Sequence, residues 1–268
     1  MNNLRVKQED ITFSFGKNWQ NMLKVVAKDD FDRSLADLNR WFDNRYDLKD
    51  KTIIDIGSGS GIHSLMFYSK NPAKLFSFDY DKNSVAATTS VWEKAGRPEN
   101  WKVDHGSVLD KDYMDKLDKY DLVYSWGVLH HTGNMWEAIK NASKVAKPGG
   151  YFMLALYQDV KNYEYDIFVK KKYNAAGFLL KRWMEWSLHI WPLMKERTRN
   201  KKNPFKWNEK LPRGMNIYHD IVDWLGGLPY EVATEEELIQ FLEPLKFTLV
   251  DKDSTRMFGT YLFQKTQP

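Results

Sequence analysis

The sequence contains no cysteine among its 268 residues. Disulfide bridges and thiolate-bound metal sites are therefore excluded, and so is any reaction that proceeds through a covalent cysteine adduct. Nothing in this composition favours secretion.

Long apolar runs are also missing. No uninterrupted stretch approaches the length that a membrane-spanning helix needs, and the polar start M-N-N-L-R-V-K-Q-E-D does not have the pattern of a signal peptide. We therefore expect a soluble, cytoplasmic protein. With 43% hydrophobic residues, the chain can build one sizeable core or one domain with a large insertion.

Positive charge is unevenly spread along the chain. The formal net charge is only +4, yet the segment from Lys170 to Arg213 holds 13 Lys/Arg against 3 Asp/Glu. The rest of the chain is therefore net acidic, and the basic segment is a candidate for contact with an acidic partner.

The stretch Thr52–Gly61, T-I-I-D-I-G-S-G-S-G, predicts a buried strand that ends in a glycine turn. Its first five residues are mostly apolar and β-branched, as in a parallel sheet. Glycine at positions 57, 59 and 61 permits positive φ and lets a ligand approach the backbone. Ile62–Ser69 then has helical spacing. The turn would lie at the carboxyl end of its strand, where open α/β sheets bind ligands.

The alternation of strands and helices continues to residue 157. Further strands are predicted over Lys74–Phe78, Trp101–His105, Tyr120–Ser125 and Tyr151–Tyr157, with helices over Asn83–Ala95 and Asn134–Ala146. This succession indicates βαβ units and a parallel sheet. Asp79 follows the second strand, where a carboxylate can accept both hydroxyls of a ribose. The alternative is that Asp79 caps the next helix.

The motifs D-x-G-x-G-x-G, F-D-Y, G-S-V-L-D, Y-D-L-V-Y-S-W-G-V-L-H-H and K-P-G-G occur in this order over residues 51–157. Their succession resembles class I S-adenosylmethionine (SAM)-dependent methyltransferases, and within them the small-molecule branch that includes quinone- and sugar-pathway enzymes. The resemblance implies SAM as cofactor and S-adenosylhomocysteine as product. It also implies an α/β fold: a Rossmann-like, doubly wound, seven-stranded and mostly parallel sheet with a reversed last strand.

By this resemblance, the cofactor would contact the glycine turn and the ends of the following strands. The implied residues are Asp55, Gly57, Ser58, Gly59, Asp79, Tyr80, Ser107, Val108 and Trp126. Ser107 departs from the family pattern, because an aspartate that hydrogen-bonds the adenine amine often stands there. The adenine contact would then come from the Ser107 hydroxyl or from the backbone of Val108.

Four regions are expected along the chain. Residues 1–50 form a helical cap, which includes the aromatic cluster Phe13, Phe15 and Trp19, and residues 51–157 form the SAM-binding core. Residues 158–233 are too long for a loop and are interpreted as a helical insertion over the acceptor. Residues 234–268 complete the core, with Thr234 as a helix N-cap and closing strands over 247–251 and 260–263.

Two histidines, His130 and His131, follow the fourth strand. Methyl transfer from a sulfonium needs a base only where the acceptor loses a proton, and an imidazole can take that proton at neutral pH. The alternative is that one of the pair only caps the following helix. The adjoining S-W-G-V lacks the N/D-P-P-Y/F motif of enzymes that methylate planar amines. An oxygen, sulfur or carbon acceptor is therefore favoured.

The insertion holds a second candidate group. His219 and Asp223 are four residues apart and would share a helix face, so that the carboxylate raises the basicity of the imidazole and makes it a third candidate base. The alternative is a surface ion pair. Arg213 could hold an acidic group of the acceptor, and Tyr218 and Asp220 complete the predicted acceptor site. No metal site is predicted.

Residues 178–202 mix aromatic and basic side chains. Three interpretations stay open: a lid over the acceptor, a contact with an anionic membrane surface, or a contact with nucleic acid. We expect a small-molecule acceptor, methylated at oxygen, and nucleic acid is the less favoured partner. The alternatives are an RNA or tRNA methyltransferase, an enzyme for a lipid- or quinone-like acceptor at a membrane, and a SAM-binding protein without turnover. The sequence carries no signal of oligomeric state.

Overall fold

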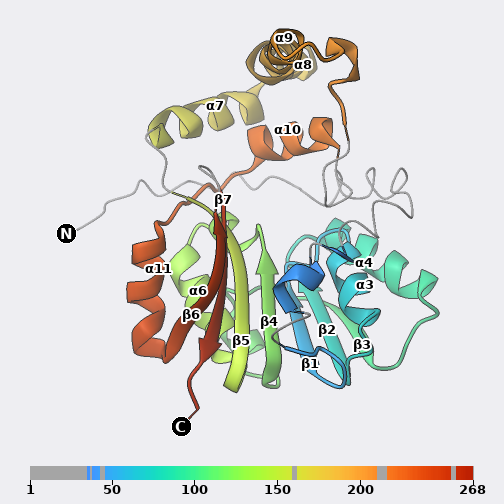
Figure 1. The fold of residues 1–268 in the computed structure, drawn as a ribbon, viewed down its shortest axis with the longest axis vertical. Coiled ribbons are helices and arrows are strands. Elements are labelled where there is room, and N and C mark those ends of the chain that lie inside the picture. Colours follow the sequence, from blue (N-terminus) through green and yellow to red (C-terminus); the bar gives the residue numbers. More distant parts are fainter. Residues whose placement is uncertain are drawn as a thin grey trace.

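The computed structural model describes residues 35–36, 38–42, 46–158, 162–209, 216–254 and 258–267. In this part of the chain, seven strands form one sheet in the order β3-β2-β1-β4-β5-β7-β6. The strands are β1 (Thr52–Ile56), β2 (Lys74–Asp79), β3 (Trp101–His105), β4 (Tyr120–Trp126), β5 (Ala146–Tyr157), β6 (Phe247–Ser254) and β7 (Phe258–Lys265). β7 runs antiparallel to both of its neighbours, β5 and β6, and the other pairs are parallel, so the predicted sheet with a reversed last strand is confirmed (Figure 1).

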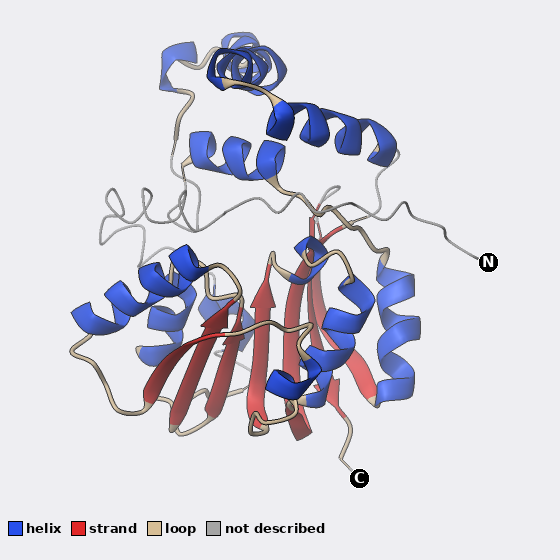
Figure 2. Ribbon diagram, turned by 180° about the vertical axis from the view of Figure 1, so that it is seen from behind, coloured by secondary structure: helices blue, strands red, loops and turns tan. Residues whose placement is uncertain are grey.

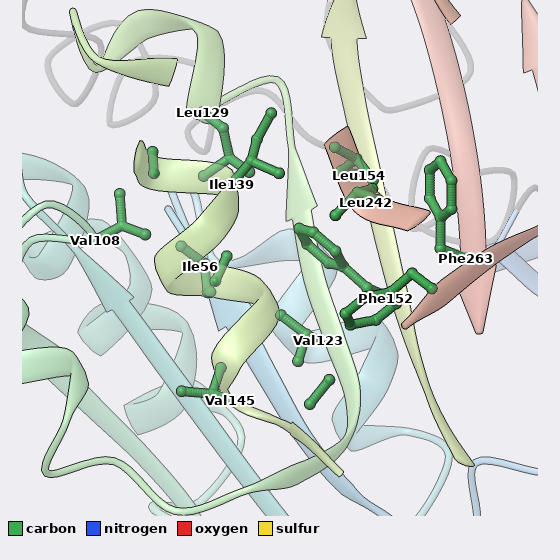
Figure 3. Packing of buried hydrophobic residues seen from close by; sticks show 14 of the residues in the cluster. Ile56, Val108, Val123, Leu129, Ile139, Val145, Phe152, Leu154, Leu242 and Phe263 are labelled. Atoms are coloured by element: carbon green, nitrogen blue, oxygen red, sulfur yellow. The ribbon is translucent and has the colours of Figure 1, made fainter. Parts of the chain in front are cut away.

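Helices cover both faces of this sheet (Figure 2). Those of the core are α3 (Ile62–Tyr68), α4 (Lys82–Lys94), α5 (Lys111–Met114), η1 (Leu129–His131), α6 (Met135–Lys144), α11 (Glu235–Leu242) and η4 (Glu243–Leu245). Successive residues of β1 point to opposite faces, and each face has its own core. Ile53 packs with Phe67 and Trp101 on one face. Ile54 packs on the other with the cluster that includes Ile139 and Phe152, drawn in Figure 3.

The fifth strand begins earlier than the sequence predicts. It starts at Ala146 rather than at Tyr151, because Ala146 already pairs with Tyr120 of β4 before a register shift in that strand. The K-P-G-G stretch therefore lies inside β5. Gly150 is required there, since a Cβ would come within 2.9 Å of the Asp121 carbonyl oxygen.

Further helices lie beyond the carboxyl ends of the parallel strands (Figures 1 and 2). They are α7 (Tyr163–Ala175), α8 (Phe178–Glu185), the π turn η2 (Trp186–Ile190), α9 (Trp191–Arg199), η3 (Pro204–Lys206) and α10 (Ile217–Gly226). This insertion, residues 162–226 in the described ranges, has a small core of its own. Val169, Tyr173, Met184, Ile221 and Leu225 are buried in it.

Glu185 ties three helices of the insertion together. It is buried, and its carboxylate accepts hydrogen bonds from the hydroxyls of Tyr173 (2.7 Å) and Tyr218 (3.1 Å). Arg182 completes the group through an ion pair of 3.1 Å with Glu185 and a hydrogen bond to the Tyr218 hydroxyl. A buried charge with all its partners in place holds α7, α8 and α10 in one arrangement.

Replacing Glu185 with alanine is expected to lower the free energy of unfolding by about 1–3 kcal/mol, because the change leaves the buried Tyr173 hydroxyl without its acceptor. Urea unfolding measures the change. Glu196→Ala is the matched control, since Glu196 lies on the neighbouring helix and is exposed. Equal losses for the two variants would contradict the role given to Glu185.

The chain returns from α10 to the core through residues 227–233. The N–H of Glu231 donates to the His130 carbonyl (2.9 Å), and the N–H of Ala233 donates to the Tyr157 carbonyl (3.2 Å). Thr234 then caps α11: its hydroxyl accepts from the Glu237 N–H, and the Glu237 carboxylate accepts from the Thr234 N–H. The predicted N-cap is thereby confirmed.

Some predictions fall outside the described residues. Phe13, Phe15, Trp19 and Arg213 are among them. Within residues 1–50, Leu38, Trp41 and Phe42 are described and are buried against the core. No helix within the described ranges has the length and apolar character needed to cross a bilayer.

Candidate cofactor and acceptor site

The glycine turn after β1 has the backbone that the sequence predicts. Gly57, Gly59 and Gly61 all have positive φ, at 77°, 54° and 78°. The turn is fastened to β2, because the N–H groups of Gly57 and Ser58 donate to the Phe78 carbonyl at 2.8 and 3.1 Å. A Cβ at Gly57 would lie 2.4 Å from both γ-carbons of Val128. The turn therefore needs glycine for its conformation and for the space that Val128 occupies.

Asp79 stands beside this turn at the tip of β2. Its Oδ2 accepts from the Gly59 N–H (2.9 Å), and its Oδ1 accepts from the Asp81 N–H (2.8 Å). Burial raises the pKa of Asp79 to about 6, although these hydrogen bonds oppose the rise. Each carboxylate oxygen can accept another hydrogen bond. The alternative role is wrong: Asp81, not Asp79, caps α4 by accepting from the Asn83 N–H.

Asp55 lies underneath the turn rather than on its surface. It is buried, and it accepts a hydrogen bond of 2.5 Å from the hydroxyl of Ser64 in α3. That hydroxyl also contacts Ser77 Oγ, which accepts from the Trp101 indole N–H. Asp55 therefore positions α3 against the sheet. Burial raises its pKa to about 7, the hydrogen bond from Ser64 opposes the rise, and the nearby charge of Asp79 adds to it.

The raised pKa of Asp55 predicts how the free energy of unfolding changes with pH. The pKa of Asp55 is higher in the folded state than its ordinary value of 3.8, so the folded state binds the proton more tightly. Its contribution to stability is present below about pH 4 and is lost as the pH rises to about 7. Relative to Asp55→Asn, the native chain should lose on the order of a few kcal/mol of unfolding free energy across this window. Urea titrations at several pH values measure it, and parallel profiles for the two proteins would contradict it.

The other predicted cofactor residues differ in their exposure and in the hydrogen bonds that they already make. Tyr80 is 66% exposed, and its ring lies stacked beside His105. The Ser58 hydroxyl lies 2.9 Å from that of Thr88, its N–H donates to the Phe78 carbonyl, and its carbonyl accepts from the Gly61 N–H, so Ser58 holds the shape of the turn. The Ser107 hydroxyl accepts from the Leu109 N–H at 3.2 Å. The side chain of Val108 is buried in the core, so any contact it makes with adenine comes from its backbone.

Aromatic rings gather at the carboxyl ends of β4 and β5. The ring of Trp126 lies 6.1 Å from that of Phe258, at the start of β7, and Phe258 lies 5.6 Å from Tyr157. The ring centroids of Tyr157 and His130 are 4.5 Å apart, and those of His130 and His131 are 4.2 Å apart. The structure therefore brings the predicted Trp126, His130 and His131 together, beside Val128 and the glycine turn.

The two histidines have different surroundings. Nδ1 of His131 lies 2.6 Å from the Pro229 carbonyl oxygen, so that nitrogen carries the proton. Burial lowers the pKa of His131 to about 3, with the Lys170 charge acting in the same sense and the Pro229 carbonyl opposing. His130 is buried, and neither of its ring nitrogens has a hydrogen-bond partner among the described residues. Burial and the charges of His131 and Lys170 hold its pKa well below the usual range. Both imidazoles are therefore neutral at pH 7.

Lys170 was not predicted as part of the site. It belongs to the basic segment, yet it is fully buried, and its ammonium donates to the Trp224 carbonyl. Its Nζ lies 4.3 Å from the centroid of the Trp224 ring, 4.5 Å from Tyr230 and 5.9 Å from Tyr157. Burial lowers the pKa of Lys170 to about 7, against the attraction of Asp166 and Asp223. In sequence it is one of three consecutive lysines, which are typical of a solvated surface.

The second predicted group, in α10, differs from the prediction in the direction of the pKa shift of His219. Nδ1 of His219 lies 2.7 Å from Oδ1 of Asn216, the N-cap of α10, and burial lowers the pKa of His219. The predicted rise in basicity from Asp223 is therefore wrong. Tyr218 is engaged by Glu185 and Arg182 inside the insertion, and Asp220 is exposed. No group of three or more His, Asp or Glu within the described ranges is arranged to hold a metal ion.

These residues fit an adenosyl group. The turn has no Cβ at Gly57 or Gly59, Asp79 has acceptor capacity for ribose hydroxyls, and Tyr80 offers an exposed flat ring beside them. Near the turn lie the rings of Trp126, Phe258 and Tyr157 and the imidazole of His130.

A family model described as a methyltransferase domain matches residues 47–210, more than half of the sequence. The chain belongs to the methyltransferase-domain family. The predictions of a class I methyltransferase fold and of SAM as its cofactor are thereby confirmed. The match begins just before β1 and includes the insertion as far as the segment after α9.

Two curated proteins resemble the chain over shorter stretches. The ubiquinone biosynthesis O-methyltransferase of Coxiella burnetii is 24% identical over 129 residues, which are 48% of this chain and 53% of that protein. The tRNA U34 carboxymethyltransferase of Cellvibrio japonicus is 27% identical over 107 residues, or 40% and 33%. The chain spans about half or less of the length of these curated relatives.

The structural likeness to methyltransferases extends further than the likeness in sequence. Magnesium protoporphyrin IX methyltransferase from Synechocystis, solved with S-adenosylhomocysteine, superposes with a TM-score of 0.57. The match covers 93% of this chain and 94% of that chain at 13% identity. At this identity, the likeness shows the fold alone.

Proposed function

We propose that the chain transfers a methyl group from SAM to an oxygen atom of a small-molecule acceptor, with S-adenosylhomocysteine as the second product. Asp79 would hold the ribose, Tyr80 would cover the adenine, and the aromatic rings near His130 would enclose the acceptor. The two named relatives act on different classes of substrate, and the O-methyltransferase among them supports the choice of oxygen. The lack of a proline motif after β4 supports it too.

The observation that carries this proposal is the unpartnered imidazole of His130. Buried polar groups are nearly always hydrogen-bonded, and an exception calls for an explanation such as a ligand or a catalytic role. Among the described residues, neither nitrogen of this ring has a hydrogen-bond partner. His130 lies in η1, which follows β4, the strand next to β1. A hydroxyl of the acceptor would supply the missing hydrogen bond.

SAM, when bound, supplies a methyl group on a positively charged sulfur that is open to direct displacement. The chain aligns the acceptor oxygen through His130, which accepts the hydrogen bond of the hydroxyl. When the oxygen gains the methyl group, its proton becomes strongly acidic and passes to the ring nitrogen. An imidazole of depressed pKa suffices for this step, because the proton donor is a far stronger acid. The aromatic rings exclude water from the reacting atoms.

Replacing His130 with alanine is expected to lower kcat about a hundredfold or more, because a positioned base contributes roughly that factor. The dissociation constant for S-adenosylhomocysteine should stay within about twofold, since the ring is assigned to the acceptor and not to the cofactor. Radiolabelled SAM with a panel of phenols, catechols and sugars, matched by anilines and thiols, measures the transfer. His130→Gln tests whether hydrogen bonding alone restores part of the rate.

Two results would contradict this role. Transfer to anilines or thiols but to no hydroxyl compound would overturn the choice of oxygen. Unchanged kcat in His130→Ala would remove the imidazole from the reaction. His219→Ala separates the two candidate histidines, because the ring of His219 is held by Asn216 and its loss should leave kcat within about twofold.

An RNA acceptor is the second candidate. The tRNA U34 carboxymethyltransferase among the relatives and the basic residues 195–202 support it. Since phosphate contacts release counterions, substrate affinity would then fall steeply with salt concentration. An affinity that is insensitive to salt would remove this candidate.

A further inference from the structure

The helical segment Phe178–Arg199 leaves an unusual number of large apolar side chains in water. Figures 1 and 2 show this segment, α8 to α9, at the end of the insertion that is farthest from the sheet. Leu179 is 81% exposed, Trp183 63% and Trp191 57%, and Phe205 after the helix is 82% exposed. The other exposed apolar residues here are Phe178, Leu180, Trp186 and Leu188. We call the exposed side of residues 178–206 the aromatic-basic face.

A π turn aligns two of these tryptophans. The N–H of Trp191 donates to the carbonyl of Trp186, five residues before it, and the two rings lie 6.4 Å apart at 30°. Pro192 accounts for the turn, because proline has no N–H and its ring would collide with the carbonyl of Leu188 in a regular helix. In an uninterrupted α-helix, residues five apart point in different directions. The backbone departs from regular geometry here and sets both rings on one side.

The face contributes little to the fold of the insertion. The side of the helix that packs inward carries Met184, Glu185 and Ile190, which are buried. Exposing a contiguous apolar surface to water is unfavourable, and such patches mark contacts with partners. The exposed rings and leucines are therefore available to a partner.

Positive charge borders the apolar residues. The exposed Lys and Arg side chains of this part of the insertion, apart from Arg182, which is paired with Glu185, are Lys171, Lys172, Lys195, Arg199, Lys201, Lys202 and Lys206. Glu196 and Glu209 are the exposed acids between residues 178 and 209, and Glu209 is paired with Arg197 at 2.9 Å. The face therefore complements a negatively charged partner.

We infer that the aromatic-basic face binds the surface of an anionic lipid bilayer, with the helix lying in the plane of the interface. Helices that combine tryptophan and leucine with lysine and arginine lie at this depth, where the rings enter the boundary region and the cations meet the headgroups. Leu179, Leu180 and Leu188 favour lipid over nucleic acid, because aliphatic side chains neither hydrogen-bond a phosphate nor stack on a base. This inference does not depend on the nature of the methyl acceptor.

Cosedimentation of the full chain with vesicles tests the inference. The chain should bind vesicles of phosphatidylcholine mixed with phosphatidylglycerol, and should bind pure phosphatidylcholine at least about tenfold more weakly. Trp183→Ser with Trp191→Ser should lower binding to the mixed vesicles at least about tenfold, because two inserting rings are lost. Lys195→Glu with Arg199→Glu should have a similar effect, and high salt should weaken binding by the native chain.

Controls come from the sheet domain. Val250→Ser removes an exposed apolar side chain of β6, and Lys116→Glu reverses an exposed charge after α5; neither should alter vesicle binding. Because every substituted side chain is exposed, the urea midpoints of the variants should match the native value. Equal binding by the native chain and the Trp183→Ser, Trp191→Ser variant would overturn the inference. So would binding to a single-stranded polyuridine RNA without binding to either vesicle. The assay involves no methyl transfer, so its outcome is separate from that of the proposed function.

Discussion

Replacing Asp79 with alanine is expected to weaken the binding of S-adenosylhomocysteine at least about a hundredfold. Two ribose hydroxyls would lose a charged acceptor, and each hydrogen bond to a charged group contributes about 1.5–3 kcal/mol. The loop itself would also lose a contact, since Asp79 accepts the N–H of Gly59. Titration calorimetry measures the change. Asp115→Asn, which removes an exposed carboxylate far along the chain, should leave the affinity unaltered.

A ligand variant separates the contact with ribose from the support of the loop. An S-adenosylhomocysteine analogue that lacks the ribose 2′-hydroxyl should bind the native chain about tenfold or more weakly than the parent compound. Asp79→Ala should bind the two ligands about equally, because the partner of that hydroxyl is gone. Asp79→Asn keeps one acceptor oxygen, so its discrimination between the two ligands should lie between those of the native chain and Asp79→Ala. Equal discrimination by the native chain and by Asp79→Ala would remove the ribose assignment.

Replacing Gly57 with alanine is expected to be as severe, for a steric reason. The residue has φ of 77°, and its new Cβ would lie 2.4 Å from both γ-carbons of Val128. Strain in the left-handed region costs about 1–2 kcal/mol, and the collision displaces the segment that leads to His130. We expect cofactor affinity to fall about a hundredfold or more and methyl transfer to fall with it.

Two further variants show whether the collision causes this loss. Gly96 also has positive φ, at 90°, but a Cβ there would meet nothing within 4 Å. Gly96→Ala should therefore introduce backbone strain without a collision, and it should leave cofactor binding nearly unchanged. Adding Val128→Gly to Gly57→Ala removes both γ-carbons and the Cβ of residue 128, which would lie 2.9 Å from the new Cβ, and should restore part of the affinity. If the double variant binds no better than Gly57→Ala, the close packing of the turn is not the cause.

Local patterns in the sequence predicted the sheet and the cofactor turn well. The strand T-I-I-D-I, the glycines that follow and the acid at Asp79 are set by short-range rules of backbone geometry, and β1, β2 and their turn have these features. The helix of Thr234 was predicted for the same reason, because a capping box is a local motif. Strand ends were predicted less well, since β5 begins where β4 offers a partner.

The surroundings of Lys170 and Phe258 depend on contacts between distant segments, which sequence patterns did not indicate. The sequence around Lys170 is typical of a charged surface, but the rings of Trp224 and Tyr230, more than fifty residues away in sequence, enclose its ammonium group. His219 is a local case: it has a carboxylate at helical spacing, but Nδ1 of its ring lies 2.7 Å from Asn216, the N-cap three residues before it. Phe258 gives no signal in sequence and joins the rings at Trp126 only because β7 pairs with β5.

Calorimetric titration of the full native chain with S-adenosylhomocysteine, with and without NAD as competitor, tests the central claim most directly. That claim is that the turn at Gly57 and the carboxylate of Asp79 bind an adenosyl group. We expect saturable binding at one site per chain that NAD does not displace. Absence of binding heat for S-adenosylhomocysteine, together with heat for NAD, would contradict it.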